Sequence, residues 1–173
     1  DPADPSKSRI LAIWDQNATN GTPPAGFSYG SYWTQSQIEA EFTPNPPNVI
    51  ARGDNDFIAP GHGTHVAGIA AGNAGMAPKA DLVVVVANFS FNGIIDGVKF
   101  ARDFAHNAGK PCAVNLSIGS SVTNHEGNTN MPKLINNLLT GTEGFSVIAA
   151  AGNDGNNNGH WGGFQLKNDT AMM

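Results

Sequence analysis

Hydrophobic positions in this chain fall into two alternating kinds of segment. Short, predominantly apolar runs of strand length occur at 9–14, 81–87, 112–118 and 145–151. Between them, apolar residues recur at helical spacing in 62–72, 91–108 and 132–139, and a further helix is expected near 34–42. Predominantly apolar runs are typical of strands buried on both faces, as in parallel sheets. The pattern therefore predicts an α/β fold, a doubly wound parallel sheet with helices on both faces.

In open α/β sheets, the functional crevice lies at the carboxyl ends of the strands. Asp15 directly follows the first apolar run, and Asn153 follows the last. A carboxylate at that edge is a candidate for orienting a catalytic base. Taken alone, Asp15 is better explained as a helix or turn cap, and Asn153 is better explained as part of an ordinary turn.

His62 opens a glycine-rich segment, 61–72, that is predicted to be a helix. A histidine in the first turn is exposed yet held on a rigid element. The positive end of the helix dipole disfavours the imidazolium ion, so the ring is expected to serve as a base near neutral pH. Gly68 is expected to let a neighbouring element pack closely against the helix. The predicted packing face consists of Val66, Ile69 and Ala70.

Two patterns were considered as metal sites. His62 and His65 are three residues apart, whereas the zincin motif needs a spacing of four and a glutamate where this chain has Gly63. Asp54-Asn55-Asp56 has two spaced carboxylates but lacks the further ligands of an EF-hand loop. No metal ligand is therefore assigned, and structural calcium stays open.

Composition excludes several classes of function. The 173 residues carry a net charge of −5 and no basic stripe, which argues against a nucleic-acid partner. No apolar run reaches the roughly 18 residues of a membrane-spanning helix. The single cysteine, Cys112, cannot form an internal disulfide, and its apolar surroundings predict a buried thiol.

The segment Gly61-His62-Gly63-Thr64-His65-Val66-Ala67-Gly68 resembles the histidine motif of the subtilisin-like serine proteases, H-G-T-H-V-A-G. The resemblance implies that His62 is the general base and His65 a structural neighbour. It also implies that Asp15 is the triad aspartate, because the family places that residue at the end of the first core strand. Many members have a glycine-containing turn after it, whereas this chain has Gln16-Asn17-Ala18.

Two later segments carry further resemblance to this family. Asn115–Gly119 resembles the segment that pairs with the substrate backbone, which implies a binding role for Ser117, Ile118 and Gly119. Asn153 resembles the asparagine that donates to the oxyanion of the tetrahedral intermediate. The small residues Ala150, Ala151 and Gly152 before it would form a shallow wall for a substrate side chain.

The family's serine motif, G-T-S-M-A-x-P, surrounds none of the ten serines of this chain. Asp169-Thr170-Ala171-Met172 echoes it faintly, with alanine for serine, but follows Asn153 too closely. The nucleophile is therefore expected outside residues 1–173. These residues are expected to form a single partial subtilisin-like catalytic domain, incomplete at its C-terminus, and the polar, proline-containing start is typical of a processed or cut end.

The leading interpretation is a serine endopeptidase that hydrolyses peptide bonds by a Ser-His-Asp triad and needs no cofactor for its chemistry. Its expected partners are a peptide or protein substrate and the missing C-terminal part of the domain, from the same gene or a second chain. The family resemblance implies an extracytoplasmic or secreted location. The alternative is a non-catalytic peptide-binding protein on the same scaffold.

Overall fold

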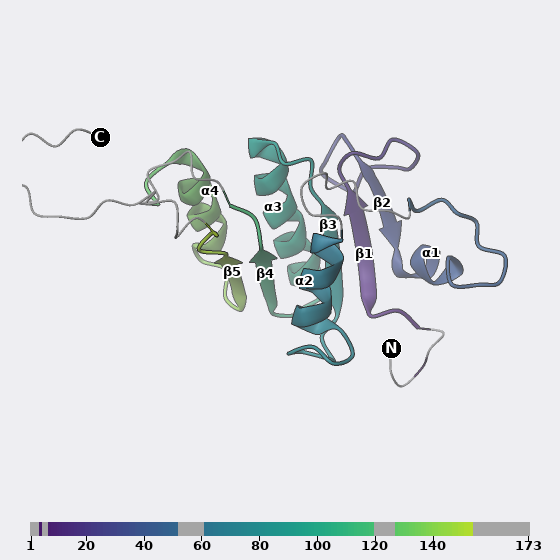
Figure 1. Cartoon of the computed structure of the whole chain (residues 1–173). Coiled ribbons are helices and arrows are strands. Elements are labelled where there is room, and N and C mark those ends of the chain that lie inside the picture. Colours follow the sequence, from purple (N-terminus) through teal and green to yellow (C-terminus); the bar gives the residue numbers. More distant parts are fainter. Residues whose placement is uncertain (1–3, 5–6, 52–60, 120–126, 154–173) are drawn as a thin grey trace, which may run out of the picture.

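The computed structural model describes residues 4, 7–51, 61–119 and 127–153 (Figure 1). Strands and helices alternate along most of the chain, as the hydrophobic pattern predicted. In chain order the elements are β1 (Ile10–Asp15), β2 (Ser31–Thr34), α1 (Gln35–Ala40), α2 (His62–Ala71), β3 (Leu82–Val86), α3 (Phe91–Asn107), β4 (Cys112–Leu116), α4 (Asn130–Leu139) and β5 (Phe145–Ala149).

The strands form two sheets, and each sheet contains one parallel pair. One sheet has the order β2-β1-β3 and the other is the pair β4-β5. β1 and β3 are parallel, with Asp15 opposite Val86, and β4 and β5 are parallel, with Leu116 opposite Ala149. The predicted α/β class with parallel strands is confirmed. The expectation of one continuous sheet is not met within the described residues, because no hydrogen-bonded pairing joins β3 to β4.

β2 is a short edge strand that the hydrophobic pattern did not predict. It runs antiparallel to β1, with Tyr32 opposite Trp14. Four residues are too few for a clear alternation. The aromatic residues before α1 pack onto the core: Trp33 is 3% exposed, and Phe27, Tyr29 and Tyr32 pack against the core cluster.

The core lies between β1 and α3. Ala12 and Trp14 of β1 are fully buried and pack with Phe100 of α3, which is 6% exposed. The Trp14 ring lies 4.5 Å from that of Phe27 and 5.3 Å from that of Phe100, between ring centroids. Since successive side chains of a strand point to opposite faces, Asp15 projects from the face opposite Trp14 and α3. Figure 1 shows α2 in front of β3.

Gly30 supports this core by a close backbone approach. Its φ is +77°, and a methyl group there would lie 2.6 Å from the Asp15 carbonyl oxygen and 2.5 Å from Trp14 Nε1. We expect Gly30→Ala to lower the free energy of unfolding by about 3 kcal/mol, because backbone strain and overpacking add. Chemical denaturation measures the loss.

Gly26→Ala is the matched control for this substitution. Its φ is +87°, but a methyl group there would meet nothing within 4 Å. The control variant should lose only about 1 kcal/mol, the cost of the left-handed backbone alone. Equal losses in the two variants would contradict the role of the close approach at Gly30.

Candidate active site

Asp15 ends β1, and its carboxylate is held by the turn that follows. Oδ1 accepts hydrogen bonds from the backbone N–H groups of Asn17 at 2.9 Å and Ala18 at 3.2 Å. No hydrogen bond to Oδ2 is present among the described residues. The backbone thus fixes Oδ1, whereas Oδ2 remains available to accept a hydrogen bond.

Gln16, the next residue, is a site residue that the sequence analysis did not identify. Its backbone N–H donates to Val86 O at 3.0 Å and extends the β1–β3 ladder. Its side chain, with the residue 5% exposed, donates from Nε2 to Gly93 O at 2.8 Å and accepts at Oε1 from Asn88 N at 3.0 Å. The segment that follows Asp15 is therefore tied to the connection between β3 and α3. A polar residue directly after an apolar strand was the only signal in the sequence.

His62 is the first residue of α2 and is exposed, as predicted. Gly61 before it has φ of +82°, a left-handed conformation that favours glycine. The other end of α2 is anchored near the start of β1, because the Arg9 guanidinium donates to the carbonyl oxygen of Ala71. Ten helical residues span about 15 Å, so α2 begins near the edge where β1 ends. Figure 1 shows this direction: α2 runs opposite to β1 and β3.

The predicted role of Gly68 is wrong. A methyl group on Gly68 would meet nothing within 4 Å, and Ile69 on the expected packing face is 56% exposed. The close approach occurs instead at the end of the helix, where a methyl group on Gly72 or Gly75 would lie 2.5 or 2.7 Å from the Gly68 carbonyl oxygen. The glycines therefore serve the turn after α2, and most of the helix surface is uncovered.

The two expected substrate-binding segments lie side by side at the carboxyl ends of β4 and β5. Ala150 N donates to Leu116 O at 3.0 Å, so the ladder continues one residue beyond β5. A methyl group on Gly119 would lie 4.0 Å from Gly152 Cα. The parallel register thus brings the segment 117–119 together with 150–152.

Asn153 is exposed and follows Gly152, whose φ is +94°. Its side chain makes no hydrogen bond among the described residues, which leaves the amide free to donate to a bound group. Asp15 ends β1 and His62 begins α2, whereas Asn153 follows β5, directly after the segment 150–152 that lies beside 117–119. Within the described part of the chain, no hydrogen bond or ion pair joins Asp15, His62 and Asn153 to one another.

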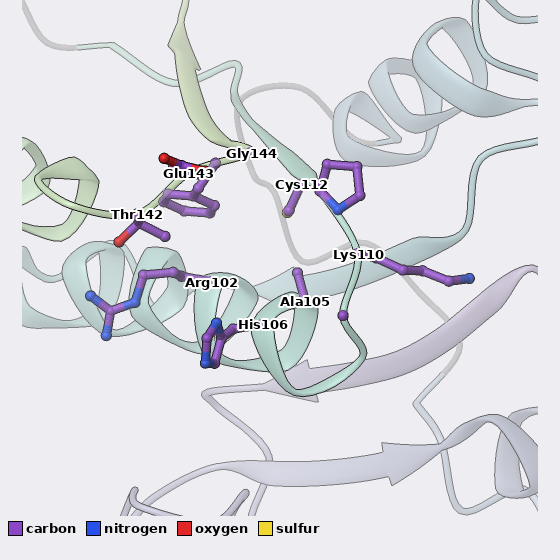
Figure 2. Close-up of a pocket in the computed structure, with 11 residues that line it drawn as sticks. Arg102, Ala105, His106, Lys110, Cys112, Thr142, Glu143 and Gly144 are labelled. Carbon is purple, nitrogen blue, oxygen red and sulfur yellow. The ribbon is translucent and has the colours of Figure 1, made fainter.

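A cavity of about 380 Å³ lies at the opposite ends of β4 and β5, where these strands begin (Figure 2). Cys112, His106 and Glu143 contribute to its lining. Two basic residues at the cavity are already ion-paired, Arg102 with Asp103 and Lys110 with Asp81. The cavity is therefore separate from the carboxyl-edge site, and its cations are neutralised by their neighbours.

Cys112 was predicted to be buried but is only partly so, because it lines this cavity. Burial nevertheless raises the pKa of its thiol. Since the thiolate is the reactive form, we expect slow alkylation by iodoacetamide at pH 7–8, with a midpoint above the ordinary value of about 8.5. The pH dependence of the alkylation rate measures this. The unfolded chain is the control, and an identical midpoint in folded and unfolded protein would contradict the prediction.

The described residues contain no group of three or more His, Cys, Asp or Glu side chains that could hold a metal ion. Asp54-Asn55-Asp56, the segment considered for calcium, lies outside them. In the same part of the chain, no helix combines the length and the apolar character needed to cross a membrane.

Comparison with known proteins gives a family match over most of the chain. The model of the subtilase family matches residues 10–168. The chain is 33% identical over 155 residues to subtilisin-like protease 3 of Pseudogymnoascus destructans, covering 82% of this chain and 35% of that protein. It is 38% identical over 108 residues to thermitase of Thermoactinomyces vulgaris, covering 56% of this chain and 35% of that protein.

The fold is also similar to a solved structure, that of the Clostridium perfringens CspB protease. The TM-score is 0.71 at 27% sequence identity, over 87% of this chain and 32% of that one. The chain thus spans about a third of the length of the proteins it matches.

Proposed function

This chain belongs to the subtilase family of serine proteases, and from that premise we propose that it supplies the aspartate, histidine and oxyanion asparagine of a serine endopeptidase. The observation that best supports this is the approach of two elements to one edge. β1 presents the Asp15 carboxylate there with one oxygen uncommitted, and α2 begins there with an exposed His62.

The proposed roles follow from the chemistry of acyl transfer. The His62 imidazole accepts the proton of a serine hydroxyl as its oxygen attacks the scissile carbonyl, and then donates it to the leaving amine. Oδ2 of Asp15 accepts a hydrogen bond from the N–H on the other ring nitrogen of His62, which keeps the imidazole in the correct tautomer. Asn153 donates to the oxygen that gains negative charge in the transition state. Residues 117–119 and 150–152 would hold the peptide backbone and one side chain.

The serine itself is proposed to come from outside residues 1–173, either from the same gene or from a second chain. Surfaces left uncovered in the structure support a requirement for further protein. α4 has no buried residue, and β4 and β5 form a two-stranded sheet. Large apolar side chains that are at least 39% exposed include Ile69, Val86, Phe89, Phe91, Leu134 and Ile148. Burying such surface is the usual driving force for association between parts of a domain.

Labelling with a fluorophosphonate, a reagent for activated serines, tests the proposal. Residues 1–173 alone should neither be labelled nor hydrolyse a peptide substrate, whereas the chain combined with the serine-bearing segment should do both. Asp81→Asn, a change at an exposed carboxylate where β3 begins, serves as the control that should keep activity. Stoichiometric labelling of a serine within residues 1–173 would contradict the proposed source of the nucleophile.

The second candidate function is peptide binding without cleavage. The side-by-side segments at Gly119 and Gly152 support it, because a backbone clamp can bind an extended peptide without any nucleophile. The downstream reading frame separates the two candidates: a G-T-S-M motif supports the protease, and its absence supports the binder. We favour the protease because a binding protein has no use for an oxyanion donor.

No cofactor is proposed for the chemistry itself, and a structural calcium ion remains a separate proposal. An extracytoplasmic or secreted location is proposed from family membership. Partners other than the substrate and the remainder of the domain are not proposed.

A further inference from the structure

Gln16 is a buried amide whose side chain joins both ends of the connection between β3 and α3. Asn88, whose backbone N–H donates to Oε1, is the second residue of this connection, and Gly93, whose carbonyl accepts from Nε2, lies in the first turn of α3. The residue is 5% exposed. An apolar side chain of the same size would leave the Asn88 N–H without its acceptor and would remove the bond to Gly93 O, a carbonyl within α3.

The backbone of Gln16 belongs to the turn that fixes Asp15. Its N–H is bonded to Val86 O, and the next two N–H groups, of Asn17 and Ala18, hold Asp15 Oδ1. Asn17 adds a contact from Nδ2 to Ala87 O at 3.4 Å. A shift of Gln16 therefore moves the donors that orient the carboxylate.

The connection that Gln16 holds is strained. Phe89 has a φ of +56°, uncommon for a bulky residue, and its side chain is 64% exposed. Asn88 Oδ1 bridges it by accepting from the backbone and hydroxyl of Ser90 at 2.9 and 2.7 Å. Such a conformation persists only where surrounding bonds over-determine it.

Gly93 leaves the space that the amide needs. A methyl group on Gly93 would lie 2.7 Å from Gln16 Oε1 and 2.0 Å from Asn88 Oδ1. The glycine and the glutamine therefore fit as a pair.

We propose that Gln16 is a positioning residue. It holds the Asp15 carboxylate and the segment 87–93, which comprises the connection and the first turn of α3, together as one rigid unit. This inference rests on the proposed protease function. Gln16 does not touch the reacting atoms; it acts through Asp15. Because misplacing a catalytic group by about 1 Å can cost about 10²-fold in rate, loosening this unit should lower turnover while leaving substrate binding intact.

The test measures kcat and KM for Gln16→Ala and Gln16→Glu in the active protein, with the serine-bearing segment present. Gln16→Ala should lower kcat roughly 10- to 100-fold with little change in KM. Gln35→Ala is the matched control: the Gln35 amide also donates to a backbone oxygen, Ser8 O at 2.7 Å, but Gln35 is the first residue of α1 and makes no hydrogen bond to the Asp15 turn among the described residues. The control should retain the parental kcat.

Gln16→Glu keeps the volume and adds a pH-dependent readout. The protonated carboxyl can donate to Gly93 O and accept from Asn88 N, as the amide does, whereas the carboxylate has no proton to donate. The ratio of its kcat to the parental kcat should therefore rise as pH falls. This variant decides the question if Gln16→Ala does not fold.

A parental kcat in folded Gln16→Ala, or a ratio for Gln16→Glu that does not change with pH, would overturn the role of Gln16. Asp15→Asn measured in parallel separates this failure from that of the protease assignment. If Asp15→Asn keeps parental turnover, the triad itself is wrong. If it loses turnover while both Gln16 variants keep it, only the positioning role is refuted.

Discussion

Replacing Asp15 by asparagine is expected to lower turnover about 10⁴-fold, equivalent to about 5 kcal/mol of transition-state stabilisation. The amide keeps the size of the carboxylate but not its charge. It can present an N–H where an acceptor is needed, which favours the wrong imidazole tautomer of His62. The measurement is kcat on a peptide substrate with the serine-bearing segment present.

Asp81→Asn is the control for this change, because Asp81 lies where β3 begins, at the opposite end of the sheet from Asp15. It pairs with Lys110 on the surface, and exposed pairs contribute at most about 1 kcal/mol to stability. The control should keep parental turnover and fold normally. Near-parental turnover in Asp15→Asn would show that Asp15 is not the triad aspartate.

Asn153→Ala is expected to lower kcat by about 10²–10³-fold, a magnitude known from subtilisin itself. The Asn153 side chain is exposed and uncommitted in the structure, so its removal should not disturb the fold. The hydrogen bond it would donate strengthens as the carbonyl oxygen becomes negative. KM should therefore change little, because the bond contributes mainly in the transition state.

A matched control is Asn137→Ala on the exposed surface of α4. It makes the same change in the same residue type, and neither kcat nor KM should change. A rise in KM at constant kcat for Asn153→Ala would instead assign Asn153 to ground-state binding. That outcome would refute the proposed role of Asn153 as the oxyanion donor.

The local signals in the sequence were sufficient for the α/β class and for most of the elements. Apolar runs such as 81–87 indicate strands by composition alone, and the amphipathic spacing in 91–108 indicates a helix. Family membership likewise followed from a contiguous motif around His62, and the match over residues 10–168 confirms it. The assignment of catalytic roles to Asp15, His62 and Asn153 remains a prediction, because it depends on the proposed protease function.

Only the tertiary structure decided what each polar residue contacts. Nothing in the sequence around Gln16 predicts its burial, but β1–β3 pairing and the packing of α3 bury it between Asn88 and Gly93. Gly68 was expected to permit close packing, yet the close approach occurs in the turn at Gly72 and Gly75. Hydrogen bonds and contacts between residues distant in sequence depend on strand register and helix placement, and local patterns do not encode either. The sequence by itself therefore determined the class and the family, whereas the fold determined which residues hold the site together.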